Sequence, residues 1–440
     1  AMIFPACLRV LEASAQPQAE VDFLKGEPHR KHPGVTNLKA LRLPEELQTA
    51  ARTIIQSRFL TDRSHSLTNF LWSRKRAVED ATLRKAAVSL ERELWKKAIE
   101  KGGGECDVLH KTKVEMRQLR GTVCLCFRYD EEFGVVYMAA RLAGGYAAMR
   151  RALNEIKKRD PSFAPQSLLD FGSGLGTVVW ASHSYWADSL KEMVCVDSSG
   201  PMNTLAERLL KGADEKAQPH IKQVYFRQFL PVSPKVQFDL VAAAFTLSEI
   251  SGVKDREEAV FTLWRKTGSY LVLVENGTKE GHQLLMEARD TLLMKQETTV
   301  HDSRPASVFA PCPHELTCPK LAQKMVVPCN FQQLYHPLPL PGHNECRTEK
   351  FSYLIVTRGE PAEPAPDGTV DWARLVAPVL RRARHVHCRT CSSDGQLHHM
   401  VVTARKHSRD VYRCARSSEW GDRLPIVPTA EEDEHSDSEG

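Results

Sequence analysis

The sequence contains no apolar run near the roughly 20 residues that a membrane-spanning helix requires, so we expect no membrane segment. No Gly-Lys-Ser/Thr follows its glycine-rich motif, which excludes a P-loop. The first 20 residues contain Arg9 and few acids, so we expect no secretory signal and only a weak organellar presequence. What is present is a composition with 42% hydrophobic residues, which is typical of soluble globular proteins.

The chain length of 440 residues exceeds one ordinary hydrophobic core, so we expect about two to three domains. Its twelve cysteines do not suggest a secreted disulfide scaffold in a chain this long. Their clustering instead favours metal binding in a reducing compartment.

A glycine-rich motif predicts a nucleotide-binding turn. The segment 170–176, Asp-Phe-Gly-Ser-Gly-Leu-Gly, follows a short apolar run and precedes residues that can open a helix. Strand, glycine turn and helix begin a nucleotide-binding α/β domain, because glycine permits positive φ and close approach of the ligand. Another acid ends the next apolar run, 21 residues after the last glycine, where a carboxylate suits a ribose. The pattern resembles S-adenosylmethionine (SAM)-dependent methyltransferases, and the expected SAM-binding residues are Asp170, Gly172, Gly174, Gly176 and Asp197.

Further apolar runs at 238–245, 270–275 and 351–357 alternate with helical segments, which predicts a parallel sheet covered on both faces. Ahead of the glycine motif, we expect helices that start at Pro44 and that span 80–101 and 129–158. The last of these is expected to be one long or broken amphipathic helix, with Gly144-Gly145 as the expected break.

Three cysteines, Cys312, Cys318 and Cys329, are separated by 5 and 10 residues, and each adjoins a proline that stiffens the loop. A fourth ligand would complete a tetrahedral zinc site or a four-cysteine iron–sulfur cluster. A wide trio with a distant fourth cysteine favours the cluster, because zinc sites usually combine two closely spaced pairs. The candidates for the fourth ligand are Cys346, Cys388 and Cys391.

Residues 381–423 carry ten Lys/Arg against four Asp/Glu, whereas 431–439 carry six acids and no base. Basic side chains interleaved with aromatic residues and histidines suit phosphate contact and base stacking on RNA. A solvated basic face is the alternative. We expect no DNA binding, and RNA contacts are expected from Arg381, Arg382, Arg384, Arg405, Lys406, Arg409 and Arg413.

No catalytic residue can be named. Base N-methylation generally uses a polar clamp after the fourth strand, but this position reads Ala242-Ala243-Ala244-Phe245. No cysteine lies there to serve as a C5-methylation nucleophile. Glu249 and Glu275 are the only carboxylates near this position, and each is equally well explained as a residue at the end of a helix or strand. We therefore expect a non-catalytic SAM-binding protein; the alternative is an active rRNA methyltransferase, and a metal-dependent redox enzyme is disfavoured because no acid/base pair accompanies the cysteines.

These features give an expected domain order. The fold class is α/β and Rossmann-like, with an N-terminal helical region and a Cys-rich metal-binding insertion and C-terminal extension. Its parts are a mainly helical region (1–124), a SAM-binding domain (125–300), a Cys-rich insertion with late strands (301–359), a linker (360–368), a basic region with the fourth metal ligand (369–428) and an acidic, disordered tail (429–440).

Five motifs together resemble one family: Tyr137-x3-Arg141, the glycine motif at 168–176, Val-Glu-Asn-Gly-Thr at 274–278, Cys-Pro-His-Glu-x2-Cys-Pro at 312–319 and Cys-Ser-Ser-Asp-Gly at 391–395. Over about 125–425, the chain is similar to the methyltransferase-like proteins of the mitochondrial small ribosomal subunit, in particular the animal members. The resemblance implies a SAM fold, a role in small-subunit assembly in the mitochondrial matrix, and binding of rRNA. It also implies a [4Fe-4S] cluster, with zinc as the alternative, on Cys312, Cys318, Cys329 and Cys391.

Overall fold

The computed structural model describes residues 23–55 except 25, isolated positions between 66 and 92, residues 130–295 except 213–215, 232, 234–235 and 251, residues 302–359 except 324–326 and 340–344, and residues 372–426. The predictions for the helix over 80–101, the linker 360–368 and the tail 429–440 lie wholly or largely outside these residues. Within them, no helix is long and apolar enough to span a membrane.

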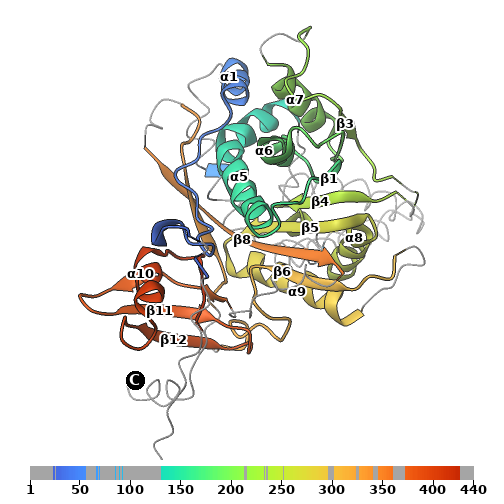
Figure 1. The fold of residues 1–440 in the computed structure, drawn as a ribbon. Coiled ribbons are helices and arrows are strands. Elements are labelled where there is room, and N and C mark those ends of the chain that lie inside the picture. The colour runs from blue at the N-terminus through green and yellow to red at the C-terminus, as the bar shows by residue number, and fades with distance from the viewer. Residues whose placement is uncertain are drawn as a thin grey trace, which may run out of the picture.

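A large sheet forms the centre of the molecule, with the strand order β3-β2-β1-β4-β5-β8-β6 and with β7 also paired to β8 (Figure 1). Five parallel strands build one part: β1 (Ser167–Phe171), β2 (Glu192–Val196), β3 (Val224–Arg227), β4 (Phe238–Ala244) and β5 (Thr267–Asn276). The remaining strands are β6 (Ala306–Ala310), β7 (Phe331–Tyr335) and β8 (Arg347–Arg358).

The prediction of a parallel sheet is wrong for β8, which runs antiparallel to β5, β6 and β7. A parallel connection needs a crossover of a dozen or more residues, usually helical. Residues 336–346 separate β7 from β8 and number just under a dozen, and the two strands pair from Tyr335 opposite Arg347, so β8 runs back along β7.

Helices cover both faces of the sheet, as predicted. On one face lie α1 (Glu45–Ile54), α5 (Glu131–Arg159), α6 (Thr177–Trp186) and α7 (Gly200–Lys211), which share one apolar core. On the other lie α8 (Val253–Arg265) and α9 (Lys279–Lys295), with a second core. The predicted helix start at Pro44 is confirmed, because Pro44 caps α1.

The predicted break at Gly144-Gly145 is wrong, because α5 continues through both glycines. A Cβ atom on Gly144 would lie 2.3 Å from Glu349 Oε2, and one on Gly145 would contact Phe245 and Thr177. The glycines therefore let this helix pack closely on its neighbours rather than interrupting it.

The C-terminal module, residues 372–426, forms a separate small sheet with its own core. Its strands are β9 (Ala373–Leu375), β10 (Leu380–Arg381), β11 (Val386–Cys391), β12 (Leu397–Val402) and β13 (Arg423–Leu424), and α10 (Arg409–Ser417) packs on one face. The N-terminal segment around the short helix η1 (His29–Lys31) fastens this module. Thr36 donates its backbone N–H to Asp422 Oδ1 at 2.7 Å, and His32 Nε2 lies 2.8 Å from Ser418 Oγ.

Candidate functional site

The glycine loop after β1 adopts the positive-φ conformation that its glycines favour. Gly172, Gly174 and Gly176 have φ values of +69°, +49° and +72°. A Cβ atom on Gly172 would lie 2.3 Å from Thr246 Oγ1, so not even alanine fits there. The loop lines a cavity with an empty volume of about 390 Å³.

Asp170 lines this cavity at the end of β1, where its side chain is buried. Neither of its carboxyl oxygens has a hydrogen-bond partner among the described residues. Burial, with a smaller contribution from Asp197, raises the pKa of Asp170 well above its usual range. Because a buried polar group without a partner is costly, this carboxyl is set to receive a donor from a ligand.

Asp197 lies beside the glycine loop and fixes its shape. Its Oδ2 accepts a hydrogen bond from the backbone N–H of Gly174 at 2.8 Å, and its Oδ1 accepts one from the N–H of Ser199 at 2.9 Å. The carboxylate therefore ties the loop to the start of α7. Each of these oxygens has a second lone pair that could accept a hydrogen bond from a ribose hydroxyl. Ribose binding by Asp197 stays a prediction.

Among the further side chains that line the same cavity are Tyr137, Arg141 and Phe245, which were not assigned to it from the sequence. Phe245 follows β4 with a φ of +58°, which is uncommon for an aromatic residue. The Arg141 guanidinium carbon lies 4.8 Å from the centre of its ring, and Arg141 Nη1 donates to the buried Glu349 Oε1 at 3.0 Å. The Tyr137-x3-Arg141 spacing, which places both residues on one helix face, is the signal that could have identified them.

Glu275 occupies the end of β5, next to the position where a methyltransferase clamp would stand. It is buried, and its Oε1 accepts a hydrogen bond from the backbone N–H of Ser248 at 3.2 Å. Burial raises the pKa of Glu275 to about 7, although hydrogen bonds from Ser248 oppose the shift. The contact holds the short helix η2 (Leu247–Glu249), which gives this carboxyl a structural role.

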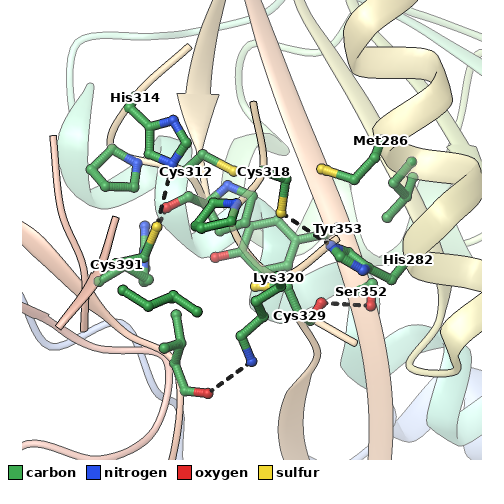
Figure 2. Close-up of a pocket in the computed structure, with 17 residues that line it drawn as sticks. His282, Met286, Cys312, His314, Cys318, Lys320, Cys329, Ser352, Tyr353 and Cys391 are labelled. Atoms are coloured by element: carbon green, nitrogen blue, oxygen red, sulfur yellow. Dashed lines mark hydrogen bonds between the residues drawn. The ribbon is translucent and has the colours of Figure 1, made fainter. Parts of the chain in front are cut away.

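A second cavity, with an empty volume of about 470 Å³, is lined by Cys312, Cys318, Cys329 and Cys391 (Figure 2). These cysteines come from the segment after β6, the loop that follows, the residues before β7 and the end of β11. The cavity therefore lies where the large sheet and α9 meet the C-terminal module.

The other two candidates for the fourth ligand lie elsewhere. Cys388 is buried in the core of the C-terminal module, and Cys346 is exposed. Of the three candidates, only Cys391 lines the cavity. Over the described part of the chain, however, no group of three or more His, Cys, Asp or Glu side chains has the arrangement of a site for one metal ion. The expected metal-binding insertion is therefore not confirmed.

Two histidines contact these thiols. His314 Nε2 lies 3.3 Å from Cys391 Sγ, and His282 Nε2 lies 3.8 Å from Cys318 Sγ. Arg289 holds the intervening loop against α9, because its Nη2 donates to the carbonyl oxygens of His314 at 3.0 Å and Leu316 at 2.7 Å.

Cations surround the four cysteines. Burial raises the pKa of Cys312 to about 11, while Arg289 and Arg374 act in the opposite direction. Burial likewise raises the pKa of Cys329 to about 12, opposed by Lys320 and Arg374. Lys320 is only 8% exposed, and its Nζ lies 3.5 Å from a backbone carbonyl oxygen. Among the residues that the structure describes, Lys320 has no ion pair with a carboxylate, and it lines the same cavity as the four thiols.

The seven expected RNA contacts are all exposed on the C-terminal module. They lie at the end of β10, in the β10–β11 turn, in the turn after β12 and along α10: Arg381, Arg382, Arg384, Arg405, Lys406, Arg409 and Arg413. Arg381 differs from the rest, because its guanidinium donates to the carbonyl oxygens of Arg416 at 2.6 Å and Ser418 at 2.7 Å.

Comparison with known proteins identifies related sequences. Residues 131–425 match the family described as "Mitochondrial small ribosomal subunit Rsm22". The chain is 48% identical over 432 residues to the human "Ribosome assembly protein METTL17, mitochondrial", covering 95% of this chain and 91% of the relative. It is 26% identical over 325 residues to the Schizosaccharomyces pombe "Rsm22-cox11 tandem protein 2, mitochondrial", covering 66% of this chain and 43% of the relative.

Two solved structures are similar only at a low level. A magnesium protoporphyrin IX methyltransferase from Synechocystis PCC 6803 is 13% identical, with a TM-score of 0.31 over 49% of this chain and 84% of that one. A putative RNA methyltransferase from Pyrococcus horikoshii is 10% identical, with a TM-score of 0.29 over 48% and 83%. The family match, by contrast, covers well over half of the sequence. The chain therefore belongs to the Rsm22 family of the mitochondrial small ribosomal subunit.

Proposed function

We propose that this protein assists assembly of the mitochondrial small ribosomal subunit in the matrix, as a non-catalytic SAM-binding protein whose C-terminal module contacts rRNA. Membership of the family and the name of the human relative support the role in ribosome assembly. The observation that carries the proposal is the four-cysteine cavity, because it joins the Rossmann-like sheet to a module with an exposed basic surface.

The residues of the first cavity fit SAM. The methionine part of SAM carries an ammonium group, and the buried Asp170 carboxyl offers two acceptor oxygens without partners among the described residues. Gly172 and Gly174 line the cavity without side chains, so a ligand can approach the backbone of the loop closely. Asp197 would accept hydrogen bonds from the ribose hydroxyls.

The second cavity fits a [4Fe-4S] cluster held by Cys312, Cys318, Cys329 and Cys391. A widely spaced cysteine trio with a distant fourth cysteine on the same cavity suits a four-cysteine cluster better than one zinc ion, which is the alternative. The buried Lys320 would be compensated by the negative charge of the thiolates. A bound cluster would supply a structural link between the sheet and the C-terminal module.

The basic surface of the C-terminal module suits contact with rRNA phosphates. Since the Arg381 guanidinium is hydrogen-bonded to two carbonyl oxygens, we assign it to the shape of the β10–β11 turn. The proposed phosphate contacts are Arg382, Arg384, Arg405, Lys406, Arg409 and Arg413.

Methyl transfer to rRNA is the rival function. The glycine loop and the buried Asp170 carboxyl support it as well, because a methyltransferase also needs a SAM-binding cavity. Against it, the residues after β4 supply no amide or carboxylate clamp, and the Phe245 ring lies against Arg141 in their place. A methyl-accepting base therefore finds no group there that orients its amine.

Three measurements on the purified full chain test the proposal: SAM binding by calorimetry, co-sedimentation with mitochondrial small subunits, and transfer of labelled methyl groups to rRNA. We expect SAM binding and co-sedimentation without methyl transfer. Failure to sediment with the subunit contradicts the assembly role, and methyl incorporation selects the rival. Asp170→Asn should weaken SAM binding, whereas the exposed control Asp188→Asn should bind SAM as wild type does.

A further inference from the structure

The face of the C-terminal sheet opposite α10 carries an exposed mixture of apolar, imidazole and guanidinium groups. Leu380 in β10, His387 in β11 and Val401 in β12 are direct cross-strand neighbours. Leu380 is 48% exposed and Val401 is 37% exposed. The next row pairs Arg389 with His399. Because side chains alternate across a strand, these five residues share one face, while the intervening residues pack in the core beneath α10.

The histidines on this face present flat rings to one another. The rings of His387 and His399 are stacked with centres 5.2 Å apart and an angle of 27°, and His387 Nδ1 lies 3.1 Å from His399 Nε2. His385 meets His387 edge to face at 4.9 Å. With the exposed Leu380 and Val401 beside them, these rings form a partly apolar surface on which planar groups can stack.

Positive charge borders this surface. Arg382 and Arg384 lie in the turn from β10 to β11, Arg405 follows β12, and Arg389 stands within the face; all four are exposed. The acid in the β11–β12 turn, Asp394, is engaged by His398 Nε2 at 2.7 Å. A ligand that combines flat apolar groups with negative charges is complementary to this arrangement.

We propose that this sheet face, defined by Leu380, His387, Arg389, His399 and Val401, binds unpaired RNA nucleotides. Bases stack on the histidine rings and the aliphatic side chains, and the bordering arginines contact the phosphates. Duplex RNA does not suit the face, because its bases are already stacked on each other and its major groove is too narrow for side chains. The proposal rests on the proposed binding of rRNA and specifies which form of RNA the module recognises.

The stacking face continues into the four-cysteine cavity. The row after Arg389 and His399 pairs Cys391 with Leu397, and both of these residues line that cavity. A metal centre on Cys391 would therefore fix the end of the strand that carries His387 and Arg389.

The test compares a single-stranded RNA of about 12 nucleotides with a blunt-ended RNA duplex of similar length, by fluorescence anisotropy on the full chain. His387→Ala/His399→Ala should weaken binding of the single strand about tenfold and leave duplex binding and the salt dependence unchanged. His387→Tyr/His399→Tyr should restore single-strand binding. The matched control, Arg405→Ala/Lys406→Ala, removes charge only and should weaken both RNAs together with a shallower salt dependence.

Two results overturn the inference. If His387→Ala/His399→Ala loses affinity equally for both RNAs, the effect is one of charge and not of stacking. If its affinity for the single strand is unchanged, the face does not bind RNA and a protein partner becomes the better candidate. If the basic variant also binds as wild type does, the proposed rRNA contact itself fails. Near-native circular dichroism of each variant is required, so that loss of binding is not loss of folding.

Discussion

Arg374 of β9 donates hydrogen bonds to both carboxylate oxygens of Glu155 in α5, with Nη1 at 2.8 Å from Oε1 and Nη2 at 3.2 Å from Oε2. Their side chains are 3% and 0% exposed, so this ion pair is buried between the C-terminal module and the large sheet. Tyr353 on β8 donates to the same Oε1 at 2.9 Å. Arg374 also lines the four-cysteine cavity, which connects the ion pair to the proposed metal site.

Removal of one partner of this pair should strongly destabilise the protein. Burial raises the pKa of Glu155, but Arg374 and Arg151 outweigh it and hold the pKa well below its usual range. Glu155→Gln leaves two buried guanidinium groups without their carboxylate, and the unfolding free energy should fall by about 3–5 kcal/mol. Chemical denaturation measures the change. Glu131→Gln, which removes the surface partner of Arg208, should cost less than about 1 kcal/mol; equal effects would contradict the account.

Asp170→Asn should affect SAM binding and stability in opposite directions. The substitution removes a buried carboxyl with a raised pKa, so the ligand-free protein should be at least as stable as wild type near neutral pH. It also removes the negative charge and one of the two acceptor oxygens proposed for the ammonium group of SAM, so the binding free energy should weaken by about 1.5–3 kcal/mol. Calorimetry and thermal unfolding measure the two effects. Unchanged affinity would mean that SAM binds without this carboxyl.

Glu275 should make the protein less stable as the pH rises. Its pKa of about 7 in the folded state exceeds the ordinary value of 4.5, so between these values the folded state holds the proton more tightly than the unfolded state. The stabilising contribution is present below pH 4.5 and is lost as the pH rises through 7. Glu275→Gln should therefore match wild type at acid pH and exceed it by about 1–3 kcal/mol at pH 8. Denaturant titrations at pH 5 and 8 measure the unfolding free energies of both proteins. A difference between them that does not depend on pH would refute the prediction.

RNA affinity should decrease steeply with salt. The logarithm of the binding constant should fall linearly with the logarithm of salt concentration, in proportion to the phosphates contacted. Each substitution among Arg382, Arg384, Arg409 and Arg413 should reduce that slope by about 1 if its side chain neutralises one phosphate. Arg381→Ala should instead disturb folding of the module, because this side chain holds two carbonyl oxygens. A slope that none of these substitutions changes would contradict the assignment.

The sequence was sufficient for the local features of the fold. Glycines at positive φ, an apolar strand before them and a helix after them are short-range patterns, and the structure has them at Gly172, Gly174 and Gly176. The antiparallel direction of β8 was not predicted, because the apolar pattern of a buried strand is the same for a parallel and an antiparallel strand. The helix through Gly144 was missed because the reason for this glycine is Glu349, more than two hundred positions away.

The same distinction applies to the candidate site. Spacing pointed to the trio at Cys312, Cys318 and Cys329, which line one cavity, and the family resemblance pointed to Cys391 as the fourth ligand. The spacing alone left Cys388 and Cys391 open, because it does not show that the strand register turns Cys388 into the module core and Cys391 into the cavity. The buried pair of Glu155 and Arg374 joins residues 219 positions apart, so no local pattern could reveal it.

We propose that the four cysteines hold a cluster on which rRNA binding depends. Iron and acid-labile sulfide are measured in anaerobically purified full chain, and RNA affinity is then measured on the same samples. We expect about four iron and four sulfide per chain, and Cys391→Ser should lose the cluster and RNA affinity but keep SAM binding, while Cys388→Ala keeps the cluster. Stoichiometric zinc without labile sulfide, or an intact cluster in Cys391→Ser, would contradict the claim.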